Sequence, residues 1–206
     1  MQLKTKAGLA LITLGIGVFA AWNWWSKTRN FVPLDLPVSL AAGHSVTSRF
    51  KLNFDALYLI EIAAEKTIPL DTLHCLMGVD ANAVQCKDIP PAISANWVLS
   101  SNAQEQKHGT SAELHTDSSV SPRVVRVIGE FQGKSGREYT LQLTSAADGS
   151  RLAAAQPRLK VVVASIAYTD LQSAGVLVFS TAFICVFFGV ILLGVAFYAK
   201  RRAKSV

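Results

Sequence analysis

The sequence lacks the short motifs that identify many enzymes. Its 206 residues contain no G-x-S-x-G elbow, no H-E-x-x-H pair and no glycine-rich phosphate loop. Acidic residues are scattered along the chain without a recognisable catalytic pair. These absences favour a binding protein over an enzyme, and nothing in the sequence predicts a metal or another cofactor.

Cysteine is scarce, and N-glycosylation acceptors are absent. No asparagine is followed by x-Ser/Thr, which favours a bacterial periplasm over a eukaryotic lumen. Of the three cysteines, Cys75 and Cys86 lie in the middle of the chain and Cys185 lies in a long apolar run. An oxidising compartment would allow the first two to pair. We therefore predict a disulfide between Cys75 and Cys86 and a free thiol at Cys185.

The middle of the chain also lacks an excess of charge. The net charge of +6 equals the number of basic residues near the two ends, so the region between them is neutral. This distribution is typical of the cytoplasmic ends of membrane spans and does not predict a nucleic-acid surface. The six residues are Lys4, Lys6, Lys200, Arg201, Arg202 and Lys204.

Charged residues are absent from the run between Ala174 and Ala199, which is long enough to cross a membrane. Its only strongly polar side chains are Ser180 and Thr181. At about 1.5 Å per residue, a helix of this length crosses a hydrocarbon core of about 30 Å. Residues 174–199 are therefore predicted to form a transmembrane helix.

A second apolar run lies near the N-terminus, at residues 7–25, and two readings of it are open. A basic start followed by apolar residues suits both a cleavable signal peptide and an uncleaved signal anchor. The segment from Val18 to Ala20 resembles a cleavage site, but Trp22, Trp24 and Trp25 follow it, as in an interfacial aromatic belt. We favour the anchor.

The charge distribution predicts the topology. Residues 1–6 and the basic tail at 200–206 are expected in the cytoplasm, with residues 26–173 in the periplasm of a bacterial inner membrane. The residues predicted at the membrane interface are Trp22, Trp24, Trp25, Lys200, Arg201 and Arg202.

The region between the spans is predicted to be all-β. Alternating apolar residues between Phe31 and Leu40 indicate a strand, and Pro33 and Pro37 place it at a sheet edge. Residues 54–62 read as a central strand covered on both faces, and strands are also expected at 93–101, 124–131, 138–145 and 158–166. These short strands predict an antiparallel β-sandwich, Ig-like or jelly-roll in outline.

Turn and helix signals lie between the strands. Pro69 and Gly78 bracket a short helix carrying Cys75, and the Gly-Lys-Ser-Gly sequence at 133–136 suggests a hairpin. Residues 102–122 contain few apolar side chains and are expected to form a long loop.

The outer region contains two sets of residues that are candidates for a ligand site. His108, His115 and Asp117 could converge on a metal, as could His74 beside Cys75, but none of these spacings is that of a compact metal motif. Aromatic residues could stack on a carbohydrate, although at alternating strand positions they more often pack in the core. Those residues are Tyr58, Trp97, Tyr139 and Tyr168.

Small residues recur on one face of the second span. Ala182, Gly189 and Ala196 are seven residues apart, with Cys185 beside them. Small side chains allow another membrane helix to approach closely, so these four residues are predicted to form a helix-packing surface. The expected partner is the first span, a second copy or another membrane protein.

The sequence favours a binding function. We expect a membrane-anchored periplasmic module that binds another envelope or membrane protein as an accessory subunit of an envelope complex, with homo-oligomerisation open. An immunity protein that neutralises a toxin acting in the periplasm would need the same architecture. A small oligomeric channel is a third possibility, which the apolar character of the second span disfavours.

Overall fold

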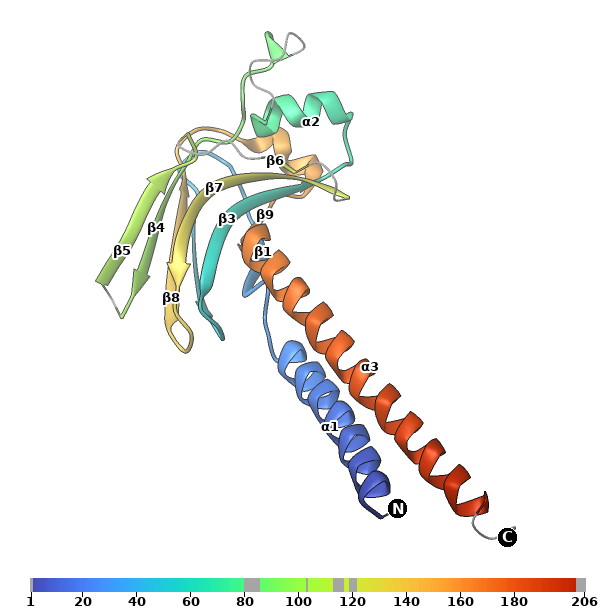
Figure 1. The fold of residues 1–206 in the computed structure, drawn as a ribbon. Helices are drawn as coiled ribbons and strands as arrows, with labels where there is room; N and C mark the ends of the chain where they lie inside the picture. The colour runs from blue at the N-terminus through green and yellow to red at the C-terminus, as the bar shows by residue number, and fades with distance from the viewer. Residues whose placement is uncertain (1, 80–85, 103, 113–116, 119–121, 203–206) are drawn as a thin grey trace. The chain divides into compact units, whose positions relative to one another are not determined.

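The computed structural model describes residues 2–79, 86–102, 104–112, 117–118 and 122–202, and it divides into two compact units (Figure 1). One unit is helical and combines residues 1–29 with 165–206. The other spans residues 30–164 and contains the sheets. Two apolar helices thus flank, in sequence, a domain of two antiparallel sheets.

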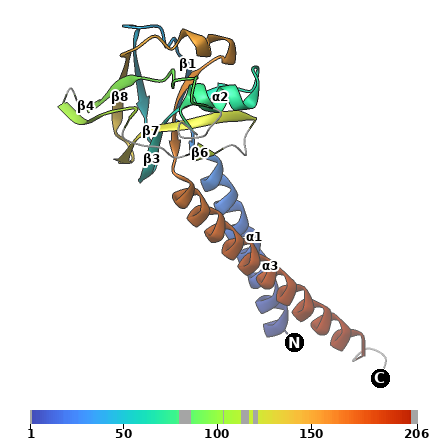
Figure 2. The ribbon, with the colours of Figure 1, turned by 90° about the horizontal axis from the view of Figure 1, so that it is seen from above.

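The helical unit consists of α1, Gln2–Lys27, and α3, Ser165–Arg202, which pack side by side (Figure 1 and Figure 2). α3 begins nine residues before the span expected from Ala174, since residues 165–173 contain no proline or glycine to end a helix. Both helices are long and apolar enough to cross a membrane. Only 11% of each apolar stretch is buried, whereas the core helix of a soluble protein would bury most of it.

The β domain is built from two antiparallel sheets. In the described residues, one sheet has the order β1-β9-β3-β7-β6 and the other the order β2-β8-β4-β5. The first contains β1 Leu34–Pro37, β9 Arg158–Val163, β3 Ala56–Glu65, β7 Arg123–Gly133 and β6 Asp117–Ser118. The second contains β2 Ser45–Lys51, β8 Glu138–Ser145, β4 Ala95–Ser101 and β5 Gln104–Thr110.

Two strand positions agree with the sequence pattern. β1 lies at a sheet edge, where Pro37 can replace a backbone donor without loss of a ladder bond. β3 is central and pairs with both β7 and β9. One face of β3 is buried and most of the other face is half-buried. The second face of this strand is therefore less completely buried than expected.

The predicted loop at 102–122 is wrong over its first part. Gln104–Thr110 forms strand β5, which pairs with β4 and whose first five side chains are exposed. An edge strand exposed on both faces has no apolar alternation, so its composition resembles that of a loop. Residues 103, 113–116 and 119–121 of the predicted loop lie outside the described residues.

The predicted hairpin between the strands at 124–131 and 138–145 is also wrong. β7 lies in the five-stranded sheet and β8 in the four-stranded sheet, so the intervening turn carries the chain from one sheet to the other. Gly136 adopts a φ of 78°, a backbone conformation that glycine allows at little cost. The glycines indicate a turn, but they do not determine which strands pair across it.

The core lies between the sheets and is rich in aromatic rings. Phe50 of β2 stacks on Tyr139 of β8, while Phe131 of β7 contacts Tyr58 of β3 as well as Phe50 and Tyr139. These four rings are at most 5% exposed, which accounts for their alternating positions along the strands. They join the two sheets into one core.

A short helix and a 3₁₀ helix complete the domain. α2, Leu70–Met77, begins after Pro69 and ends at Gly78, whose φ of 71° closes the helix in the left-handed conformation. The 3₁₀ helix η2, Ser150–Ala155, connects β8 to β9 and contacts α2. Both elements bury side chains, among them Leu73 of α2 and Leu152 of η2.

Candidate functional site

The predicted helix-packing residues of α3 lie against α1. Gly189 is buried, and a Cβ atom added to it would lie 2.6 Å from Ile12 Cγ1 and 2.8 Å from the carbonyl oxygen of Gly8. Gly8 is tight in the same way, since its added Cβ would lie 2.8 Å from the carbonyl oxygen of Gly189. Only the absence of side chains at both positions lets the two backbones approach this closely.

The same surface continues along both helices. A Cβ atom added to Gly15 would lie 2.7 Å from the carbonyl oxygen of Ala182 and 3.2 Å from Cys185 Cβ. Ala182 and Ala196 are buried, and Cys185 is half-buried with a free thiol. The α1 half of this surface was missed from the sequence, although Gly8 and Gly15 show the seven-residue spacing seen on α3.

The predicted interfacial tryptophans lie in the last turns of α1. The Trp22 and Trp25 rings have centroids 5.0 Å apart, and Arg29 Cζ lies 4.1 Å from the Trp25 ring centroid. Trp24 is 72% exposed, as a side chain that anchors in lipid head groups would be. Lys200, Arg201 and Arg202 fall in the last turn of α3, and their side chains lie outside the described residues.

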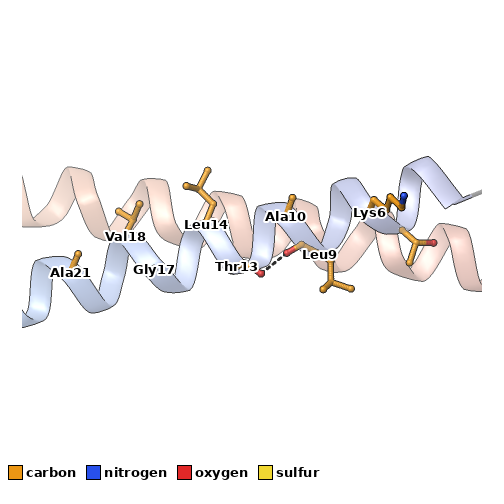
Figure 3. Close-up of a pocket in the computed structure, with 9 residues that line it drawn as sticks. Lys6, Leu9, Ala10, Thr13, Leu14, Gly17, Val18 and Ala21 are labelled. Carbon is orange, nitrogen blue, oxygen red and sulfur yellow. Dashed lines mark hydrogen bonds between the residues drawn. The ribbon is translucent and has the colours of Figure 1, made fainter.

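A second face of α1 forms a shallow, open groove, drawn in Figure 3. Gly17 lies in it, and a Cβ atom added there would meet nothing within 4 Å. The Thr13 hydroxyl donates to the Leu9 carbonyl oxygen at 2.9 Å, so this polar group is hydrogen-bonded within its own helix. The lining residues are Thr5, Lys6, Leu9, Ala10, Thr13, Leu14, Gly17, Val18 and Ala21.

In the β domain, Cys75 and Cys86 form a disulfide with a sulfur–sulfur distance of 1.99 Å. The bond joins α2 to residues just after the undescribed segment 80–85. Because the Cys75 sulfur is oxidised, it cannot serve as a thiolate metal ligand with the neighbouring His74.

Buried Arg126 of β7 forms a hydrogen bond to the end of α2, near the disulfide. No role for this residue was predicted from the sequence. Its Nη1 donates to the Met77 carbonyl oxygen at 2.8 Å and its Nη2 to the Ser111 carbonyl oxygen at 2.7 Å. Burial lowers the pKa of Arg126 from its ordinary value. Arg126 thus connects the end of α2 to the segment that follows β5.

The aromatic residues considered for carbohydrate binding belong largely to the core. Tyr58, Trp97 and Tyr139 are at most 3% exposed, so their rings cannot stack on an external ligand. The Trp97 indole N–H donates to the Ile128 carbonyl oxygen at 2.7 Å, at a bulge where Ile128 has no partner in β3. Tyr168 lies in α3, and its side chain is outside the described residues.

The histidines considered for a metal do not converge in the described part of the chain. His108 Nδ1 lies 2.7 Å from Glu105 Oε1 on exposed strand β5. His115 and the side chain of Asp117 lie outside the described residues. Within the described residues, no three His, Cys, Asp or Glu side chains are grouped to hold a metal ion.

Charged residues line up across the outer face of the five-stranded sheet. Lys160 of β9 lies in register between Asp35 of β1 and Glu61 of β3. Asp35 accepts from Arg158 Nε at 2.6 Å and lies 3.4 Å from Lys160 Nζ. Burial raises the pKa of Glu61 to about 7 against the opposing effect of the Lys160 charge. Glu61 is therefore a carboxyl group that titrates near neutral pH.

Comparisons with known proteins do not identify a family. No protein-family model and no curated protein matches the chain. It is similar to a crystal structure of a protein from Sulfurospirillum deleyianum, at 11% sequence identity and a TM-score of 0.48. That similarity covers 64% of this chain and 96% of the other.

Proposed function

We propose that α1 and α3 span a bacterial inner membrane, with both termini in the cytoplasm and the β domain in the periplasm. The exposed apolar faces of the helices, the basic residues near both chain ends and the Cys75–Cys86 disulfide support this topology. Reporters fused to either terminus should then behave as cytoplasmic, and one inserted after Lys87 should behave as exported. An exported C-terminal reporter would contradict the topology.

We also propose that the β domain is a jelly roll and not an Ig-like sandwich. When β6 is set aside, the strands pair in nested fashion as β1 with β9, β2 with β8, β3 with β7 and β4 with β5. A jelly roll arises when four such antiparallel pairs divide between two sheets. The sheet orders β1-β9-β3-β7 and β2-β8-β4-β5 support this assignment.

The function that we propose is the binding of another membrane protein, as an accessory subunit of an envelope complex. The observation that carries this proposal is the groove on α1 around Gly17. One small-residue face of α1 is already used against α3, through Gly8 and Gly15. The face with Thr13, Gly17 and Ala21 is exposed and apolar, and small residues at this spacing suit close approach by a further membrane helix.

The proposed occupant of the groove is a transmembrane helix of a different protein. Its binding is tested by Gly17→Leu, which fills the groove and leaves the α1–α3 contact unaltered. We expect this variant to lose most of the partner that copurifies from membranes dissolved in a mild detergent. The matched control is Gly194→Leu on α3, because a Cβ atom at Gly194 also meets nothing within 4 Å.

Equal recovery of the partner with both variants would contradict the proposed role of the groove. Two copies of the chain with different tags distinguish self-association from binding of another protein. Copurification of the two tags that is lost in Gly17→Leu would replace the proposed partner with a second copy.

A further inference from the structure

Three basic residues are among those that line a small pocket of about 270 Å³ in the β domain. Lys107 comes from β5, while Lys134 and Arg137 come from the turn between β7 and β8. Buried Phe131 and Tyr139 also line the pocket. The remaining lining residues are Leu99, Gln106 and Gln132, and no acidic side chain lines the pocket.

The three basic groups are exposed, and none of them forms an ion pair with the described residues. The ion pairs described elsewhere in this domain join Asp35 to Arg158 and Lys160, Glu65 to Arg123, and Glu105 to His108. None of them includes Lys107, Lys134 or Arg137. Like charges gathered at one site repel one another, and a bound anion would remove that repulsion.

The turn that carries two of these cations is held in place by backbone hydrogen bonds. Ser135 N–H donates to Asp55 Oδ1 at 2.5 Å, Gly136 N–H donates to the Leu52 carbonyl oxygen at 2.8 Å, and Lys134 N–H donates to the Tyr139 hydroxyl at 3.1 Å. Lys134 and Arg137 therefore project from a fixed backbone. Less entropy is lost on binding when the backbone that carries the recognising side chains is already ordered.

Strand β5, which carries Lys107, has an irregularity where it pairs with β4. Between Leu99 and Ser100 the β4–β5 register shifts, so Gln106 has no partner residue in β4. A bulge of this kind redirects side chains locally and is common beside binding sites. Gln106 lines the pocket next to Lys107 and adds an amide group to the three cations.

We infer that this pocket binds a phosphate group. Arginine and lysine are both common phosphate ligands, and the terminal oxygens of a phosphate group, two in a diester and three in a monoester, point in different directions and can each contact a separate cation. The pocket volume suits a compact head group and not a large ligand.

The position of the pocket in the domain favours phospholipid as the source. Gln132 is in register with Leu57, and the Leu57 carbonyl oxygen accepts from Ala164 N–H at 2.9 Å. Ala164 is the last residue of the domain, and α3 begins at Ser165. The pocket therefore lies at the end of the sandwich from which the chain continues into an apolar helix.

The inference is tested by the reactivity of lysines towards an acetylating reagent, measured by mass spectrometry on the full chain. The protein is compared in maltoside micelles alone, in micelles containing phosphatidylglycerol, and in micelles with soluble glycerol phosphate. At ten times the dissociation constant, labelling of Lys107 and Lys134 should fall roughly tenfold, since the unoccupied fraction is 1/(1 + [L]/Kd). Exposed Lys87, near the disulfide, should react equally throughout.

Two variants separate a specific pocket from general attraction of anions. Arg137→Gln removes a cation of the pocket and should abolish the protection of Lys107 and Lys134. Arg49→Gln removes an exposed cation on β2 outside the pocket and should preserve it. Near-UV circular dichroism is used to verify that both variants retain the packing of the domain.

The outcomes distinguish the two phosphate sources. Protection by phosphatidylglycerol alone assigns the pocket to lipid head groups, and protection by glycerol phosphate as well assigns it to phosphate in general. Unchanged labelling in both additions would overturn the inference. Protection that persists in Arg137→Gln would overturn it too, because it would arise without this pocket.

Discussion

Replacing Glu61 with glutamine should change how the stability of the β domain depends on pH. The folded-state pKa of Glu61 is raised from 4.5 to about 7 by burial, which outweighs the lowering effect of Lys160. Between these values the folded chain retains a proton that the unfolded chain has released. The stabilising contribution of protonated Glu61 is therefore complete below pH 4.5 and is lost as the pH rises through 7.

The size of the effect follows from the pKa shift. A rise of between two and three units, at about 1.4 kcal/mol for each, corresponds to about 3 kcal/mol of unfolding free energy. Glu61 is only half-buried, and solvent screening should reduce this to about 2 kcal/mol. Glutamine does not titrate, so the wild type should lose this amount relative to Glu61→Gln between pH 4.5 and pH 8.

The measurement is urea unfolding of the full chain in detergent micelles at a series of pH values. Trp22, Trp24 and Trp25 are replaced by phenylalanine so that fluorescence reports on Trp97, the remaining tryptophan, in the core of the β domain. Other titrating groups affect both proteins alike and cancel in the difference. Parallel stability curves for the wild type and Glu61→Gln would refute the assigned burial effect.

Two further predictions concern the core and the disulfide. Gly129→Ala places a Cβ atom against the Trp97 indole and should lower the unfolding free energy by about 1–3 kcal/mol, measured by the same fluorescence method. An unchanged midpoint would mean that Trp97 can shift. Reduction of the Cys75–Cys86 bond should cost no more than about 3 kcal/mol and leave the sandwich folded, as followed by near-UV circular dichroism. Before reduction, alkylation should modify Cys185 alone.

Features encoded by adjacent residues could be predicted from the sequence. The ends of α2 follow from Pro69 and Gly78, because each favours its backbone conformation without help from the rest of the fold. The edge position of β1 follows in the same way from its prolines. The division into apolar helices and a β domain follows from the lengths of the apolar runs.

Features that depend on distant pairing could not be predicted. Glu61 and Lys160 are far apart in the sequence and meet only because β3 pairs with β9. The basic pocket likewise depends on the crossing of the chain between sheets after β7, where the sequence suggested a hairpin. β5 was not predicted, because an exposed edge strand buries too few side chains to require apolar residues.

The glycines in the two helices show most clearly what could not be predicted from the sequence alone. Gly189 and Gly194 both interrupt the apolar run of α3, yet only Gly189 meets another backbone. Gly17 and Gly194 are both open, but their surroundings differ. Gly17 has Thr13 and Ala21 one turn away on either side, whereas Gly194 has the larger Val190 and Tyr198. A third helix could approach closely at Gly17 but would be held away at Gly194 by these larger side chains. This difference in neighbours, and not the presence of glycine, makes the α1 groove the better candidate for binding another helix.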